Sequence, residues 1–236
     1  MKDSKRKREE FIEEIKKDIL SKVEERGLNS LSSILEEIRV RYIQGIKNYG
    51  IDDPEQSWKP FKGNVLEDII LNYIVKKIRE KKLEVIKGKD LEKRSDEKLG
   101  NCLSMVKRSL AINYGELGLH LPDADLVIYN PKTCKAIIII SSKTTLRERI
   151  AQTAYWSLKL KQSNLTKNIK VMFITLDEDE DLKTKIPTKK GRAIAESDID
   201  YTYVITDGNI DESKHVRKID KFFDDLGEIL KFTLQS

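Results

Sequence analysis

Two acidic residues and one lysine stand at the ends of a predicted β-hairpin. Asp123 and Asp125 lead into its first strand, and Ser141 and Lys143 end its second strand. Side chains two positions apart on a strand project to the same face, so Ser141 and Lys143 point together, and so do the two aspartates. The hairpin therefore brings acidic and basic groups to one end of a predicted sheet.

The pairing of the two strands decides which acid meets the lysine. Counting outward from the turn places Asp125 near Ile138. Asp123 then lies near Ile140, close to Lys143, and is the better candidate. A carboxylate that holds Mg²⁺ beside an ammonium group suits hydrolysis of a phosphodiester. The ion polarises a phosphoryl oxygen and activates water, while the ammonium orients the water or neutralises developing charge.

A second charged motif, Arg147-Glu148-Arg149, begins the helix predicted to follow this strand. Guanidinium groups bond bidentately to O6 and N7 of guanine, and a carboxylate can accept from N4 of cytosine, so these side chains suit adjacent G·C pairs. Their place just after Lys143 would couple base reading to cleavage. The simpler interpretation is an exposed charge cluster at a helix N-terminus, where Glu148 favours the helix dipole and the arginines do not.

The composition excludes other routes to hydrolysis. The chain has 236 residues with 45 Lys+Arg and 40 Asp+Glu, a net charge of +5, and only two His and two Cys. A structural zinc site needs about four Cys or His ligands, so no such site is expected. Cys102 and Cys134 lie outside any C-x-x-C pair and are predicted to be reduced thiols. No apolar stretch approaches the roughly 20 residues of a membrane span, and we expect a cytoplasmic protein.

Apolar periodicity predicts the elements that position these motifs. Helices are expected over 1–26, 31–46, 61 to about 74, 99–110, 145–161 and 219–230, and strands over 125–129, 134–140, 171–175 and 201–205. This order predicts an α/β (α+β) fold in which helices flank a mixed β-sheet core. Turn residues near position 50 divide the chain into an N-terminal helical region, 1–55, and a larger domain, 56–236.

Two strongly charged stretches remain outside these elements. Residues 76–98 are mostly charged and form either a solvated helix extension with a loop, which is the favoured interpretation, or a mobile segment near a charged ligand. Residues 177–181 are all acidic and are most simply a solvated connection.

The hairpin motif resembles a known nuclease superfamily. Pro122-Asp123 followed by Ser141-Ser142-Lys143 is similar to the PD-(D/E)XK pattern, with Ser141 in the position that is acidic in most members. A serine in this position is a feature of the restriction endonucleases of the CCGG group. The strings LPDADLVIY and SSKTTLRERIAQTAY are most similar to the BsaWI-type type II restriction endonucleases.

This resemblance implies a restriction-endonuclease-like fold and a set of site residues. Asp123, Lys143, Glu67 and Ser141 would be catalytic, with Asp123 and Glu67 holding Mg²⁺. Glu67 would replace the acid missing at Ser141. Asp125 or Glu148 could be recruited as a further ligand, because Tyr155-Trp156-Ser157 cannot supply the acid that related enzymes often carry after the lysine.

The resulting expectation is a type II restriction endonuclease that cleaves both strands of a short palindromic DNA site containing CCGG or a related G·C core. Arg147, Glu148 and Arg149 would read the bases. A two-fold site favours a homodimer or a higher oligomer, and a cognate DNA methyltransferase would act on the same site. Two alternatives stay open: a structure-specific repair or recombination nuclease of the same fold, and a non-catalytic DNA-binding module.

Overall fold

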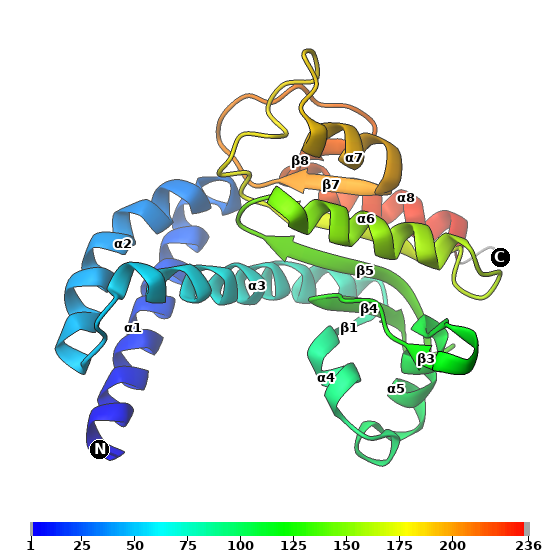
Figure 1. Cartoon of the computed structure of the whole chain (residues 1–236), viewed down its shortest axis with the longest axis horizontal. Coiled ribbons are helices and arrows are strands. Elements are labelled where there is room, and N and C mark those ends of the chain that lie inside the picture. Colours follow the sequence, from blue (N-terminus) through cyan, green and yellow to red (C-terminus); the bar gives the residue numbers. More distant parts are fainter. Residues whose placement is uncertain (1, 234–236) are drawn as a thin grey trace.

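A six-stranded mixed sheet forms the centre of the computed structural model, which describes residues 2–233 (Figure 1). Its strand order is β1-β4-β5-β6-β7-β8. Strand β4 is antiparallel to both β1 and β5, whereas β5, β6, β7 and β8 run parallel to one another. The strands are β1 (Glu84–Lys87), β4 (Leu126–Asn130), β5 (Lys135–Lys143), β6 (Lys170–Thr175), β7 (Tyr201–Val204) and β8 (Val216–Lys218). The predicted fold class is confirmed.

Strand β5 is buried on both faces, which explains its continuous aliphatic sequence. Ile138 and Ile140 belong to one hydrophobic cluster, and Ile139 between them belongs to another on the opposite face. Helices α3 and α8 cover the first face, and α5 and α6 cover the second. Because β5 and β6 run parallel, their carboxyl ends lie at the same edge of the sheet.

Six of the helices correspond to predicted apolar stripes, and α4 and α7 were not predicted. They are α1 (Lys2–Arg26), α2 (Leu31–Ile46), α3 (Pro54–Glu80), α4 (Gly88–Lys93), α5 (Asp96–Leu110), α6 (Arg147–Lys161), α7 (Lys190–Asp198) and α8 (Phe222–Thr233). Short 3₁₀ turns cover Leu28–Ser30, Lys47–Tyr49, Gly115–Leu117 and Ile219–Lys221, and a small separate sheet joins β2 (Ile112–Asn113) to β3 (Leu119–His120). Helices α1 and α2 pack with α3 in the same hydrophobic cluster as one face of the sheet. The predicted division near position 50 falls in the turn that precedes α3.

Helix α3 begins earlier and ends later than expected. Asp53 caps it by accepting a hydrogen bond from the backbone N of Gln56 at 2.9 Å, and Pro54 occupies the first turn, where its missing N–H costs nothing. The helix continues to Glu80, which confirms the favoured helix extension in part. Edge strand β1 then follows, which the charged sequence concealed because an edge strand needs little apolar surface.

The predicted register of the hairpin was wrong. Leu126 pairs with Ile140, and the register shifts between Ile128 and Tyr129, which marks a β-bulge. The backbone N of Asp125 donates to the carbonyl oxygen of Ile140 at 2.9 Å. The turn lies one residue later than predicted, and Ile137 is an extra residue in β5. Asp125 therefore lies nearer to the end of β5 than the count from the turn placed it.

The prediction of two reduced thiols was also wrong. Cys102 in α5 and Cys134 in the loop before β5 form a disulfide, with an S–S distance of 2.06 Å. The two cysteines meet because α5 packs on the face of the sheet beside β5, a proximity that their separation in sequence does not reveal. Among residues 2–233, no helix combines the length and the apolar character needed to cross a membrane.

Candidate active site

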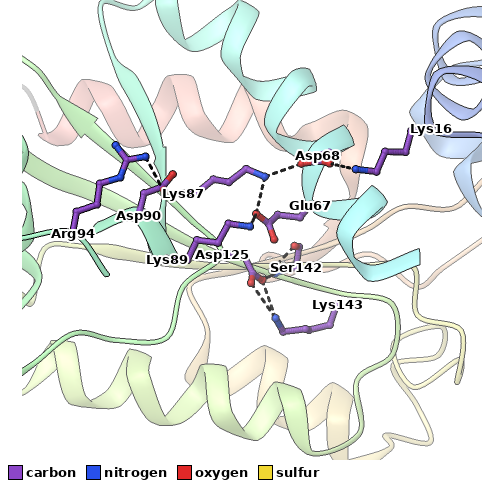
Figure 2. A network of polar contacts seen from close by, with 10 residues as sticks. All are labelled: Lys16, Glu67, Asp68, Lys87, Lys89, Asp90, Arg94, Asp125, Ser142 and Lys143. Carbon is purple, nitrogen blue, oxygen red and sulfur yellow. Dashed lines mark hydrogen bonds and ion pairs between the residues drawn. The ribbon is translucent and has the colours of Figure 1, made fainter. Parts of the chain in front are cut away.

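Asp125 and Lys143 form the centre of the candidate site (Figure 2). The ammonium Nζ of Lys143, the last residue of β5, lies 2.9 Å from Oδ2 and 3.2 Å from Oδ1 of Asp125. The backbone N of Ser142 donates to the same Oδ2 at 2.6 Å, and its hydroxyl lies 3.3 Å away. The pair is partly shielded, since the lysine side chain is 26% exposed and the aspartate 19%. The structure thus joins the lysine to Asp125 rather than to Asp123.

Asp123 contacts a different partner. Its Oδ2 accepts a hydrogen bond from the side-chain amide of Gln152 in α6 at 2.7 Å, and the residue is exposed. Asp123 nevertheless lines a small cavity of about 100 Å³ together with Glu67 and Asp125. It therefore lies next to the lysine site, tied to α6, without contacting the lysine.

Glu67 reaches the site from α3 and lies among lysines. Its Oε1 is 3.1 Å from Nζ of Lys87 and 3.6 Å from Nζ of Lys89, and its side chain is 15% exposed. This oxygen is buried and accepts no well-directed hydrogen bond. Figure 2 shows the network continuing through Asp68, which accepts from Lys87 at 2.7 Å and from Lys16 of α1 at 3.4 Å.

Neighbouring charges in this network shift the pKa values of Asp68 and Lys87. Burial acts to raise the pKa of Asp68, but the hydrogen bond and charge of Lys87, with help from Lys16, outweigh it and lower that pKa. Burial acts to lower the pKa of Lys87, and its bonds to Asp68 and Glu67 reverse this and raise it. Both groups are therefore held in their charged forms.

One cavity joins the two halves of the site. Its volume is about 430 Å³, and its lining residues come from α3, the hairpin and the start of α6: Pro60, Gly63, Asn64, Glu67, Asp125, Ser142, Lys143, Thr144, Thr145 and Arg149. The cavity brings together Glu67, Asp125 and Lys143. Ser141, by contrast, is buried in β5 and does not line it.

Close backbone contact fixes the segment just before β4 that carries Asp125. The backbone N of Gly88, which follows β1, donates to the carbonyl oxygen of Asp125 at 2.9 Å. A Cβ at Gly88 would lie 1.9 Å from the carbonyl oxygen of Ala124, well inside van der Waals contact. Only glycine allows this approach of the two chains.

The Arg147-Glu148-Arg149 motif begins α6, and all three side chains are exposed. Nε of Arg149 lies 3.7 Å from Oε1 of Glu148, a pair that solvent screens. Arg149 also lines the cavity that holds Lys143. The structure therefore brings one of the predicted base-reading residues to the lysine site and leaves the others accessible beside it.

The residues present suit one kind of metal ion. Within residues 2–233 no three acidic, histidine or cysteine side chains gather closely enough to hold a metal by themselves. Mg²⁺ in nucleotide-processing sites is usually bound by one or two carboxylates, water and substrate phosphate. Glu67, whose buried oxygen has only lysine ion pairs as partners, and Asp125 face one cavity and could supply two such carboxylates.

Several residues at the site were not singled out from the sequence. Ser142 lies between two residues that were, and the observed register places Asp125 opposite Ser141, next to Ser142. Lys87 and Lys89 lie in the charged stretch 76–98, where no pattern separates them from solvated lysines. Both lysines contact the carboxylate of Glu67, and the alternative of a mobile segment near a charged ligand stays a prediction.

Comparison with known proteins gives consistent results. Residues 102–228 match the family model described as BsaWI restriction endonuclease type 2. A Methanocaldococcus jannaschii protein named as a type II restriction enzyme, MjaVIP, is 37% identical over 219 residues, covering 86% of this chain and 95% of its own. A Helicobacter pylori protein named as a type II restriction enzyme, HpyAORF263P, is 40% identical over 89 residues, 38% of this chain and 46% of its own. The structure of the restriction endonuclease PspGI in complex with substrate DNA superposes with a TM-score of 0.55 at 16% identity, covering 93% of each chain, which shows a shared fold.

Proposed function

The chain belongs to the BsaWI family of type II restriction endonucleases, and from this premise we propose that it cleaves both strands of a short palindromic DNA site containing CCGG or a related G·C core, with Mg²⁺ as cofactor. The observation that carries the proposal is the Asp125–Lys143 pair, which shares a cavity with Glu67 and Arg149. An acid, a lysine and a base-reading arginine thus face the same space.

Asp125 and Glu67 would hold the ion, which supplies charge stabilisation at the phosphate and a more acidic water. Asp125 replaces Asp123 as the first ligand in this proposal, because Asp125 contacts the lysine. Asp123, bonded to Gln152, stays a secondary candidate. Lys87 and Lys89 balance the charge of Glu67 and lie where a DNA phosphate could draw them away.

Lys143 would act on the attacking water or on the phosphate. Asp125 and Ser142 fix the environment of its ammonium group, which can orient the water and neutralise charge that develops on the phosphoryl oxygens. The water oxygen bonds to phosphorus in line, the bond from phosphorus to the 3′ oxygen breaks, and that oxygen takes up a proton. The products are a 5′-phosphate and a 3′-hydroxyl.

Arg147, Glu148 and Arg149 would read G·C pairs in the major groove. A palindromic site calls for two copies of the site residues related by a two-fold axis, so we propose that a homodimer acts on the DNA. Host DNA would be protected by a methyltransferase that modifies the same sequence.

Digestion of a plasmid of known sequence tests the whole proposal. We expect discrete fragments with Mg²⁺ and none with EDTA, and sequencing of the fragment ends gives the site and the cut position. A smear, or cleavage only at junctions and flaps, would support a structure-specific nuclease instead.

Two lysines of β5 provide a matched test of the catalytic group. Lys143→Ala should lower the cleavage rate by about 100-fold or more while DNA binding persists, because a positioned charged group is lost. Lys135→Ala, at the exposed opposite end of the same strand, should cleave normally. Equal effects of the two substitutions would contradict the assignment.

Substitutions of the three acidic residues test which of them bind the ion. Asp125→Asn and Glu67→Gln should each raise the Mg²⁺ concentration needed for half-maximal cleavage, and Asp123→Asn should do so much less. The reverse order for the two aspartates would restore Asp123 as the principal ligand.

A further inference from the structure

The prediction of a solvated connection was wrong in part, because the acidic loop Asp177–Asp181 is held against the protein while Glu178 and Glu180 are exposed. Asp177 is buried, and its two carboxylate oxygens accept hydrogen bonds from the backbone N atoms of Asp181 and Leu182, each at 2.9 Å. Lys189 donates to the carbonyl oxygens of the loop at positions 179 and 180. These bonds give the loop a defined shape.

Within this loop, Asp179 lies at the N-terminus of α6. Both of its carboxylate oxygens are 3.2 Å from the backbone N of Leu146, and Oδ2 is 3.4 Å from the backbone N of Arg147. The first N–H groups of a helix have no partner inside the helix, and Leu146, at the N-cap position, has no side chain that could accept them. Asp179 therefore supplies from another segment the cap that α6 lacks, together with a negative charge at the positive end of the helix.

The capped residue has an unusual backbone. Arg147 has φ of 36°, in the left-handed region that a side-chain-bearing residue adopts only when its surroundings hold it there. This conformation sets the direction in which the Arg147 side chain leaves the helix. Asp179 accepts hydrogen bonds from the backbone N atoms of Arg147 and its neighbour Leu146.

The loop is anchored on its other side to the helix that carries Glu67. The backbone N of Glu178 donates to the carbonyl oxygen of Thr144 at 3.2 Å. Its carboxylate accepts from Lys62 of α3 at 2.5 and 2.6 Å, and the lysine side chain is only 12% exposed. The same few residues thus connect α3, the segment after Lys143 and the first turn of α6.

We propose that Asp179 is a positioning residue for base recognition: it holds the first turn of α6 so that Arg147 and Arg149 face the DNA in the correct orientation relative to the cavity at Lys143. This rests on the proposed function, because it assigns base reading to α6. Asp179 itself contacts neither DNA nor the reacting atoms and acts through the backbone of Leu146 and Arg147.

The test measures discrimination rather than activity alone. The probes are a duplex carrying the site found from the plasmid digest and duplexes with one G·C pair of that site replaced. Asp179→Ala should reduce the ratio of cleavage rates between these duplexes by about tenfold or more, the size of one lost base contact. Binding of unrelated duplex DNA should stay within about twofold, since phosphate contacts are unchanged.

Glu180 provides the matched control. It is the next residue of the same loop, it carries the same charge, and its side-chain contact is an exposed ion pair with Lys183 at 3.0 Å. Glu180→Ala should keep the wild-type ratio. Asp179→Asn, which retains an oxygen that can accept from Leu146, should restore most of the discrimination lost in Asp179→Ala.

Equal discrimination in the Asp179→Ala and Glu180→Ala variants would overturn the proposal. If the alanine variant does not fold, Asp179→Glu carries the test, because it moves the carboxylate by one methylene; unchanged discrimination in that variant would equally overturn it. A wild-type protein that yields no discrete fragments would refute the proposed function, a result distinct from either of these.

Discussion

Breaking the disulfide between Cys102 and Cys134 should destabilise the protein without disturbing the candidate site. The two cysteines are separated by 32 residues. For a loop of this length, the chain-entropy account of cross-links gives about 4 kcal/mol of stabilisation at 25 °C. For a chain of this size, that loss corresponds to a melting temperature lower by about 8–16 °C.

The site should be spared because the bridge and the lysine lie at opposite ends of β5. Cys134 precedes the first residue of the strand, and Lys143 is its last residue. Cleavage at 25 °C should therefore be the same in the oxidised and reduced proteins, and the difference should appear only on heating or in denaturant.

Urea unfolding with and without reductant measures the effect, and the double variant Cys102→Ser, Cys134→Ser is the control. Reduced wild type and the double variant should unfold at similar urea concentrations, both below the oxidised protein, and reductant should not affect the variant. Titration of two free thiols in unfolded, unreduced wild type would show that the bridge is absent. A stability loss below about 1 kcal/mol with the bridge present would refute the entropic reasoning.

Three further predictions concern recognition, titration and packing. Arg147→Ala should cost about 1–3 kcal/mol of discrimination at one base pair, measured as cleavage-rate ratios, whereas a uniform loss over all sequences would mark a phosphate contact. Burial raises the pKa of Asp177 to about 6, so this group's contribution to stability is greatest below its unfolded pKa near 4 and is lost as pH rises to about 6, a change of about 3 kcal/mol. The free energies of unfolding of wild type and Asp177→Asn, plotted against pH, should therefore converge or cross between these pH values. Parallel plots would contradict this. Phe173→Ala, at a fully buried position in β6, should lower the free energy of unfolding by about 3–5 kcal/mol, as measured in urea.

The parts of the fold that were predictable are those with strong apolar periodicity. Helices α1 and α2 and strand β5 carry regular stripes or continuous aliphatic runs, and burial of such surface has few alternatives. Strand β1 was missed because it is a short, charged edge strand whose place depends on pairing with β4. Local sequence does not contain that information.

The candidate site shows the same division between local and long-range information. The lysine, both aspartates and Glu67 were identified from their types and from a family resemblance. The choice between Asp123 and Asp125, however, depended on the exact place of the turn and on one extra residue in β5, Ile137. A shift of this kind is decided by how the whole sheet packs. The role of the acidic loop was hidden for a similar reason, because the bonds of Asp179 to Leu146 join segments that are 33 positions apart.

The hydrogen atom that Gly88 carries in place of a side chain limits how this enzyme can change. Any larger substituent there would collide with the Ala124 carbonyl and push away the chain that holds Asp125, although Gly88 itself has no group that could bind DNA or a metal. Under the proposed function, screens for altered cutting specificity would vary the exposed side chains at the start of α6. Substitutions of Gly88 in such screens should give inactive proteins, because the short distance between the two backbones leaves no space for a side chain.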